Sequence, residues 1–499
     1  MRANTRSRSP ASSRSLASPE SLRMSRNFIA NSGVACAGLL ASLLWGGCRA
    51  DVSAAADYPR TVPVLEAGAA VSFGSGLYVQ EKENPVHLAD FRFYEVHPGD
   101  VFLFSAKGYL YQLAFYNEDI NPDYIHSYCY SPEESWASYT KNLGTLGWRG
   151  GTRRFTGHGW ARLVVRRLDG KPVGAEDKAF VEQHCCFARR DVPYEEQPCF
   201  AGEIADTAAK VNALRSGDTL VFALLTDNHY VINGHWEDTA HNMQAVGRAS
   251  PFDALIHLGD FTDGMTPLAI TKEYFARQYA DMQRLGVPLY LVLGNHDSNY
   301  FRSNPQSLSA GEQSRLYLQH ELPYYYADFA DKRLRVLFLY SFDHTQDGQN
   351  KRYGFPLEEV DWVRQTLAAT PADYKVLVCC HVPLLASMHF WSTEIRNSGA
   401  MIQVLEDFNA DGRLLAFVHG HVHSDMVDTS SLSFPVVAIG CAKIEDEQEH
   451  KVPGSVTYSR AVGDVTQELW DVLVVNTRTG RLDFVRFGAG EDRSIGREQ

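Results

Sequence analysis

At 499 residues the chain is long enough for two domains or slightly more. Its 44% hydrophobic and 21% charged content is that of an ordinary globular protein, and excludes a disordered or largely membrane-embedded chain. The formal net charge of −13 gives the protein little electrostatic reason to bind nucleic acid, so no nucleic-acid-binding patch is expected.

Residues 1–56 are predicted to be a signal peptide and leader rather than part of the fold. Arg23 and Arg26 precede a mostly apolar stretch, 28–45, and small residues follow it. This order is typical of a secretory signal. We therefore expect an exported protein, which in a bacterium is periplasmic, at the cell surface or extracellular. Two membrane attachments stay open, namely an uncleaved signal and a lipid anchor at Cys48.

Residues 57–192 form the second predicted unit, an accessory β-sandwich domain. Short runs of alternating apolar residues are separated by turn signals, and no segment has a convincing helical period. Aromatic residues recur in these runs, among them Tyr109, Tyr111, Trp148 and Trp160. They suggest a platform for a glycan or another cell-envelope ligand, but core packing explains the same pattern.

Residues 193–218 are predicted to connect the two domains. Ile204, Ala208, Val211 and Leu214 recur at helical spacing. We therefore expect a helix that packs onto the following domain rather than a flexible linker.

The cysteines that follow the leader are too few for a disulfide scaffold in a chain of this size. Cys379 and Cys380 lie in an apolar run and are interpreted as small core residues. A pairing of Cys199 with Cys185 or Cys186 stays open.

Residues 219–490 hold the main domain, in which five polar motifs follow five apolar runs. The runs VFALLT, ALIHLG, LYLVLG, KVLVCC and LLAFVH are typical of buried strands. A parallel sheet brings the carboxyl ends of its strands to one edge, so we expect the motifs to meet there. In chain order the motifs are Asp227-Asn228-His229, Gly259-Asp260-Phe261-Thr262-Asp263, Gly294-Asn295-His296-Asp297, His381 and Gly420-His421-Val422-His423.

The domain ends in a predicted hairpin, LWDVLVVNT and RLDFVRFG, joined by the turn at 478–480. We expect it to extend or cap a second sheet. Residues 491–499 are predicted to be a surface tail, with Arg493 folded back near the site as the alternative.

The order D-x-H, G-D-x-x-D, G-N-H-D, H and G-H-x-H resembles the calcineurin-like metallophosphoesterase superfamily, with every motif in place. The resemblance covers roughly Thr219 to Phe487. It implies an α/β fold in which a sandwich of two sheets is flanked by helices. In this chain the small all-β sandwich domain precedes that fold.

The resemblance also implies two divalent metal ions, which clamp the attacking and leaving oxygens at phosphorus and lower the pKa of a bound water. Seven side chains of this chain match the family's ligands. Those of the first ion are Asp227, His229 and His423, those of the second are Asn295, His381 and His421, and Asp260 bridges the two. Such a mixed set of nitrogen and oxygen donors suits Zn, Mn, Fe, Co or Ni without choosing among them.

Two further motif residues are predicted to act on the substrate. His296 matches the family's histidine that protonates the leaving group or steadies the phosphoryl charge, and Asp263 would orient it. The role of Asp297 stays open between structure and catalysis. Outside the motifs, His389 is the best candidate for a substrate-facing residue.

Departures from two subfamilies narrow the predicted activity. Protein serine/threonine phosphatases of the superfamily have Arg where this chain has Gly264, and purple acid phosphatases have a metal-binding Tyr where it has Asp263. No Arg or Lys lies in the five motif loops. Because a monoester gains more than a diester from cationic partners for its free oxygens, we expect a preference for diesters. The alternative is that Arg302, Arg396 or Arg493 reaches the site and supplies the positive charge that favours a monoester.

The sequence thus predicts an exported metal-dependent phosphoesterase that hydrolyses phosphodiester or phosphomonoester bonds through a hydroxide bridging two metal ions. The alternative is an envelope glycan-binding protein whose metal site is vestigial or structural. The complete ligand set and the presence of His296 argue against that alternative.

Overall fold

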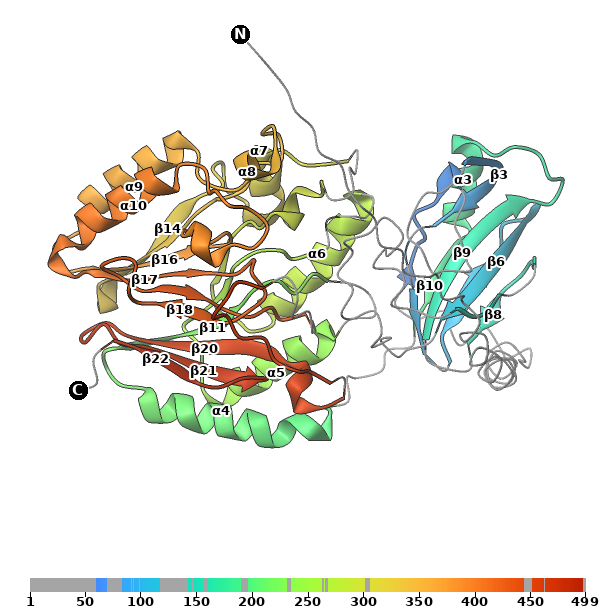
Figure 1. The fold of residues 1–499 in the computed structure, drawn as a ribbon. Coiled ribbons are helices and arrows are strands. Elements are labelled where there is room, and N and C mark those ends of the chain that lie inside the picture. The colour runs from blue at the N-terminus through green and yellow to red at the C-terminus, as the bar shows by residue number, and fades with distance from the viewer. Residues whose placement is uncertain are drawn as a thin grey trace, which may run out of the picture.

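A computed structural model describes most of the chain after residue 59 (Figure 1). The described residues are 60–69, 83–90, 92, 94–97, 99–116, 142–145, 148–155, 159–189, 196–230, 235–262, 264, 268–300, 306–443, 451–461 and 463–496. The predicted signal peptide and Cys48 lie outside the described residues. Within these ranges, none of the helices combines the length and the apolar character needed to span a bilayer.

The N-terminal unit contains two antiparallel sheets. One has the strand order β1-β10-β5-β8, and the other has the order β2-β3-β9-β6-β7 with β4 paired to β9. Leu88, Phe102 and Leu163 belong to the core that the two sheets share. The strands are β1 (Arg60–Thr61), β2 (Glu66–Ala69), β3 (Glu83–Ala89), β4 (Tyr94–Val96), β5 (Val101–Phe104), β6 (Tyr109–Tyr116), β7 (Asn142–Thr145), β8 (Arg153–Arg154), β9 (Gly159–Arg167) and β10 (Cys185–Ala188).

This unit also contains a helix, α3 (Ala175–Gln183), where the sequence pattern predicted strands alone. Only Val181 of the helix is buried, so the segment has no apolar stripe from which a helix could be predicted. Asp177 in its first turn accepts a hydrogen bond from the backbone N–H of Gly174 at 2.8 Å, which closes the start of the helix.

The aromatic side chains of the N-terminal unit divide between core and surface. Tyr111 is 1% exposed and packs against Phe102 and Phe104 with ring centroids 4.9 Å away. Core packing therefore accounts for Tyr111. Trp148 is half-buried beneath the guanidinium of Arg166, 4.2 Å from its ring centroid. The side chain of Trp160 lies outside the described residues.

Cys185, Cys186, Cys199, Cys379 and Cys380 form no disulfide among the described residues. Cys199 is exposed, whereas Cys185 and Cys186 are buried in β10, so neither pairing considered for Cys199 is formed. Cys379 and Cys380 are buried, as predicted for core residues.

The second unit is a sandwich of two six-stranded sheets, with the orders β13-β12-β11-β20-β21-β22 and β14-β15-β16-β17-β19-β18. Each strand that precedes a motif runs parallel to at least one neighbouring strand, in the pairs β11–β12, β12–β13, β15–β16 and β16–β17. The strands of the first sheet are β11 (Thr219–Leu225), β12 (Ala254–His257), β13 (Leu289–Leu291), β20 (Leu469–Asn476), β21 (Leu482–Gly488) and β22 (Arg493–Ile495). Those of the second are β14 (Tyr325–Phe329), β15 (Leu334–Phe338), β16 (Lys375–Cys380), β17 (Leu414–His419), β18 (Met426–Asp428) and β19 (Val436–Ala438).

Apolar residues on both faces of the central strands explain the layers of this sandwich. In β11, Leu220, Phe222 and Leu224 pack between the sheets, while the alternate residues pack under helices. Helices α4, α5 and α6 cover the first sheet, and α9 and α10 cover the second (Figure 1). The helices are α4 (Ala201–Leu214), α5 (Trp236–Ala249), α6 (Leu268–Gln283), α7 (Ala310–Gln313), α8 (Gln349–Arg352), α9 (Leu357–Ala368) and α10 (Ser398–Phe408).

All five predicted strands form, and the domain is the predicted two-sheet α/β sandwich flanked by helices. The strands do not share one sheet, however. β11, β12 and β13 belong to the first sheet, while β16 and β17 belong to the second. The five motifs therefore meet where the edges of two sheets lie together, instead of along the edge of one.

The C-terminal segment completes the first sheet. β20 and β21 form the predicted hairpin, and β22 then pairs with β21. Arg493 in β22 lies 2.5 Å from Asp425 and 2.6 Å from Asp471 in ion pairs. The predicted surface tail is therefore wrong for residues 493–495, because these ion pairs and the added strand hold them in the sheet.

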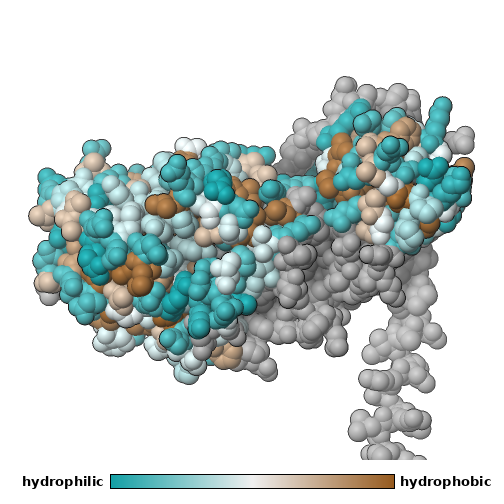
Figure 2. Space-filling view, turned by 90° about the horizontal axis from the view of Figure 1, so that it is seen from above, coloured by the Kyte–Doolittle hydropathy of each residue, from teal (hydrophilic) through white to brown (hydrophobic). Residues whose placement is uncertain are grey.

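The two units make direct contact. Arg92 of the N-terminal unit forms an ion pair with Glu273 in α6, and Ala69 and Ala89 belong to the apolar cluster under the helices of the second unit. On the face drawn in Figure 2, the described surface is mostly hydrophilic, with hydrophobic residues in small separate patches.

Candidate metal centre

The backbone of the motif loops is strained at the predicted ligands. Five of the seven have positive φ, a conformation that is uncommon for residues with a side chain and costs roughly 1–3 kcal/mol for each. They are Asp227 (52°), His229 (37°), Asp260 (57°), His421 (70°) and His423 (52°). Such backbone strain persists only where surrounding contacts impose it. Its occurrence at five predicted ligands indicates that these loops form a functional site.

Two motif glycines bring these loops close together. A Cβ atom at Gly294 would lie 2.1 Å from Oδ1 of Asp260, and one at Gly420 would lie 2.0 Å from Oγ1 of Thr226. No side chain fits at either position, so both glycines are required for the approach of one motif to another.

The two central carboxylates are each anchored through one oxygen. Oδ2 of Asp227 accepts hydrogen bonds from the Thr226 hydroxyl at 2.6 Å and from the His421 N–H at 2.9 Å. Oδ1 of Asp260 accepts one from the His296 N–H at 2.8 Å. The remaining oxygens, Oδ1 of Asp227 and Oδ2 of Asp260, are buried without a hydrogen-bond partner of good geometry among the described residues. Both are thus available to a ligand.

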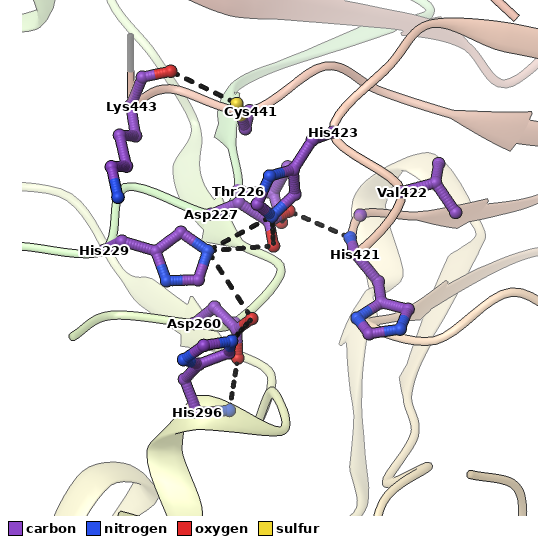
Figure 3. A network of polar contacts seen from close by, with 12 residues as sticks. Thr226, Asp227, His229, Asp260, His296, His421, Val422, His423, Cys441 and Lys443 are labelled. Carbon is purple, nitrogen blue, oxygen red and sulfur yellow. Dashed lines mark hydrogen bonds and ion pairs between the residues drawn. The ribbon is translucent and has the colours of Figure 1, made fainter. Parts of the chain in front are cut away.

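A first group of ligand atoms surrounds the available oxygen of Asp227 (Figure 3). Nε2 of His423 lies 3.2 Å from that oxygen and Nε2 of His229 lies 3.7 Å from it. The two nitrogens are 3.2 Å apart. Because one ion with bonds of about 2 Å can reach all three atoms, this group fits a single metal position.

A second group surrounds the available oxygen of Asp260. Nε2 of His381 lies 3.1 Å from that oxygen and 3.0 Å from Oδ1 of Asn295, and His421 also belongs to the group. Nδ1 of His381 donates to the carbonyl of Leu258 at 2.8 Å, so Nε2 carries the lone pair that a metal needs. The Asp260 oxygen is also 3.7 Å from Nε2 of His229. Asp260 therefore faces both groups, as a bridging ligand must.

The electrostatics of the site favour a cation. Burial by itself would raise the pKa of the Asp227 carboxyl, but His381 and His423 hold that pKa well below its ordinary value. Burial lowers the pKa of His381, yet Asp260 and Asp227 outweigh it and raise that pKa to about 9. The two buried carboxylates thus stay ionised and attract positive charge, from a proton or from a metal ion.

Residues 220–425 match the family model described as calcineurin-like phosphoesterase. The chain carries a calcineurin-like phosphoesterase domain. Enzymes of this family hydrolyse phosphoric esters and typically bind divalent metals. No curated protein matches the chain significantly in sequence.

Solved structures resemble this chain at low identity. A dimetal phosphatase from Danio rerio is 15% identical, with 56% of this chain and 99% of that chain covered and a TM-score of 0.40. Purple acid phosphatase PPD1 from yellow lupin (Lupinus luteus) is 12% identical, with 82% and 74% covered and a TM-score of 0.40. These likenesses are too distant to carry an argument about activity.

His296 stands beside the ligand groups of the phosphoesterase domain. Its Nε2 is 3.9 Å from Oδ2 of Asp260, and its ring meets that of His229 edge-on at 4.5 Å. Asp263, which was predicted to orient His296, lies outside the described residues. Its neighbour Gly264 is described and packs closely on His296, since a Cβ atom there would lie 2.2 Å from the His296 carbonyl oxygen.

Asp297 holds two motif loops of the phosphoesterase domain together. Its carboxylate accepts hydrogen bonds from the backbone N–H groups of Gly294 at 2.7 Å, Asp260 at 2.9 Å and Phe261 at 2.9 Å. Burial and the nearby Asp260 raise its pKa to about 7. These contacts to backbone give Asp297 a structural role, one of the two alternatives that the sequence left open.

His389 lies against a predicted metal ligand. It is 4% exposed, and its Nε2 is 2.8 Å from Nε2 of His421. Trp391 meets the ring of His421 edge-on at 5.1 Å. The segment that contains both residues thus lies against His421, and the substrate-facing role of His389 stays a prediction.

Sequence reasoning missed Lys443. This residue lies in the site next to the first motif, with its backbone N–H donating to the carbonyl of Asp227 at 3.2 Å. Figure 3 shows its side chain beside His229. Lys443 lies beyond the last motif, and no pattern in its surroundings marks it as a site residue.

Proposed function

We propose that the phosphoesterase domain hydrolyses phosphoester bonds with two divalent metal ions held by the seven predicted ligands. The main support is the pair of buried carboxylate oxygens of Asp227 and Asp260, which lack a hydrogen-bond partner of good geometry among the described residues and face histidine nitrogens. A buried anionic oxygen without a partner is costly, and a divalent ion beside each would compensate for that cost.

The donors fit Zn, Mn, Fe, Co or Ni, with two carboxylates, one amide oxygen and imidazole nitrogens. When bound, two such ions activate water as a nucleophile and draw negative charge from the phosphoryl oxygens. The protein contributes fixed donor positions: Thr226 orients the Asp227 carboxylate and Leu258 orients the His381 ring.

His296 is the residue best placed to handle the proton of the reaction. It lies beside Asp260, and although His229, Asp260 and His296 also lie close enough together to hold a metal ion, the resemblance assigns His296 to the substrate. An imidazole there can donate a proton to the leaving oxygen as the ester bond breaks. On the side of His421, the indole of Trp391 packs edge-on against the imidazole ring.

The test is metal analysis combined with activity. Purified protein reconstituted with Zn or Mn is expected to contain two ions per chain, to hydrolyse nitrophenyl phosphate esters and to lose activity on chelation. Asp260→Ala should abolish hydrolysis and remove much of the metal, because both ligand groups share that carboxylate. Asp428→Ala, which changes a partly buried aspartate at the end of β18, is the matched control and should change neither. At most one ion per chain in the reconstituted wild type would refute the dinuclear proposal.

We further propose that the protein is exported, on the basis of the signal-like order of residues 1–56. Cell fractionation together with N-terminal sequencing of the mature chain tests this. An intact N-terminus in a cytoplasmic fraction would contradict it.

A further inference from the structure

The expected preference for diesters was based on the absence of basic residues from the motif loops. The folded chain changes that premise, because a segment outside the motifs brings a lysine to the site. Arg493, considered earlier as a source of positive charge, is instead committed to ion pairs with Asp425 and Asp471. Lys443 is therefore the residue to consider.

We propose that Lys443 binds the free, non-bridging oxygens of the phosphoryl group and thereby makes phosphomonoesters the preferred substrate class. This inference rests on the proposed phosphoesterase function and adds to it the residue that distinguishes a monoester from a diester. Lys443 would take no part in holding the metals.

The backbone places Lys443 directly against the first motif. After β19 the chain runs beside the segment that carries Asp227. There the N–H of Ala442 donates to the carbonyl of Thr226 at 2.9 Å, and the N–H of Lys443 donates to the carbonyl of Asp227 at 3.2 Å. These two successive hydrogen bonds fix the register between Lys443 and a predicted metal ligand.

That register also determines the position of the Lys443 side chain. The residue is 8% exposed and its Nζ atom is buried. In Figure 3 the side chain extends away from Cys441 towards His229, so its amine ends beside the first ligand group. A buried ammonium beside a phosphate site can act on a bound anion with little screening by solvent.

Arg460 holds the segment that carries Lys443. Its guanidinium donates to three successive carbonyls, those of Cys441 at 2.9 Å, Ala442 at 2.8 Å and Lys443 at 2.6 Å. It also donates to the carbonyl of Thr466 at 3.1 Å. A planar guanidinium with several acceptors gives a rigid anchor. The position of the lysine is thus preorganised before substrate arrives, which is what an effective anion-binding group requires.

The chemistry of the two ester classes explains the expected selectivity. A phosphomonoester dianion has three non-bridging oxygens, whereas a diester has two and a single negative charge. The third non-bridging oxygen of a monoester can accept a hydrogen bond from a donor beside the metals. An ammonium there makes a charge-assisted hydrogen bond to the monoester, and a diester carries an ester group in that place, which accepts such a bond poorly.

Lys443 and Arg460 both lie beyond residue 425, where the match to the family model ends. The metal ligands lie within the matched segment. The contact of Lys443 with Asp227 is made by its backbone N–H, so we expect a substitution of the side chain to change substrate selectivity without removing the metals.

The experiment compares wild type, Lys443→Met and Lys443→Arg as full mature chains loaded with the same metal. For nitrophenyl phosphate, kcat/KM should fall ~10²-fold in Lys443→Met, as for loss of a preorganised donor, while the value for bis-nitrophenyl phosphate changes less than about 5-fold. Lys443→Arg should retain most of the monoester activity. Metal content and thermal stability should match wild type. Lys375→Met, at the opposite end of β16 from His381, is the control and should change nothing.

Calorimetry with inorganic phosphate gives a readout that needs no turnover. Phosphate affinity should fall in Lys443→Met and be largely retained in Lys443→Arg. If Lys443→Met does not fold, Lys443→Gln replaces it, since the amide keeps a polar group at the buried end. An equal loss for both esters, or unchanged phosphate affinity, would overturn the role of Lys443. A wild type that binds phosphate through Lys443 but cleaves neither ester would instead refute the proposed function.

Discussion

The replacement of Asp297 tests whether its carboxylate has a structural or a catalytic role. In Asp297→Ala, the backbone N–H groups of Gly294, Asp260 and Phe261 lose their acceptor. Asp297 is fully buried, so water cannot readily take its place. A buried donor left without an acceptor costs about 1–3 kcal/mol, which gives about 3–9 kcal/mol for the three.

Relaxation of the strained backbone at Asp260, where φ is 57°, would return part of this cost, roughly 1–2 kcal/mol. We therefore expect Asp297→Ala to lower the free energy of unfolding by about 1–8 kcal/mol, and the melting temperature by at least about 2 °C. Because the loops of Asp260 and Asn295 lose their common anchor, metal should be lost as well. Asp297→Asn keeps one acceptor oxygen and should be intermediate.

The assay is thermal unfolding of chelated and metal-loaded protein, with elemental analysis and kcat for nitrophenyl phosphate on the same samples. Asp428→Ala is the control, since that carboxylate also accepts hydrogen bonds from backbone N–H groups, of Ser430 at 2.8 Å and Ser431 at 2.9 Å, but at a position that is only partly buried. It should cost less than about 1 kcal/mol. If Asp297→Ala kept its stability and both metals but lost kcat, Asp297 would be a chemical participant and the structural reasoning would be wrong.

Two further predictions concern the proton donor and stability in acid. His296→Ala should keep both metals yet lower turnover by ~10²–10⁴, with a smaller loss for esters that have good leaving groups; equal losses for nitrophenyl and alkyl esters would argue for another role. Burial would raise the pKa of Asp425, but Arg486 and Arg493 lower it. The ionised carboxylate therefore stabilises the folded protein at pH values above the ordinary pKa of an aspartate. This stabilisation is lost as the pH falls through the lowered pKa of Asp425 in the folded protein. Denaturant unfolding from pH 6 to pH 2 should therefore show a shallower loss of stability in Asp425→Asn than in wild type, and parallel curves would contradict the assignment.

Local signals in the sequence were sufficient to predict the strands and to select polar side chains that the structure brings together. Each apolar run, such as that of β11, is buried on both faces, so its composition alone identifies a central strand. The residue types that follow each run, as in Gly294-Asn295-His296-Asp297, carry the metal chemistry within a few positions of the strand end. The helix α4 was predictable for the same reason, since its apolar residues recur at the helical period.

Helix α3 and strand β22 were not predictable in this way. The helix has one buried residue and no apolar stripe, and β22 is held by ion pairs of Arg493 with residues distant in the chain. Neither segment carries in its own residues the contacts that stabilise it.

The sequence by itself determined which side chains could bind metal, because motif spacing after a buried strand is a local property. Only the tertiary structure decided that the motifs come from two sheets and that Asp297 binds the backbone of a neighbouring loop. It alone brought Lys443 beside Asp227 through hydrogen bonds between distant segments. The physical reason is that pairing between segments far apart in the chain depends on how whole layers pack, and no short stretch of sequence records that packing.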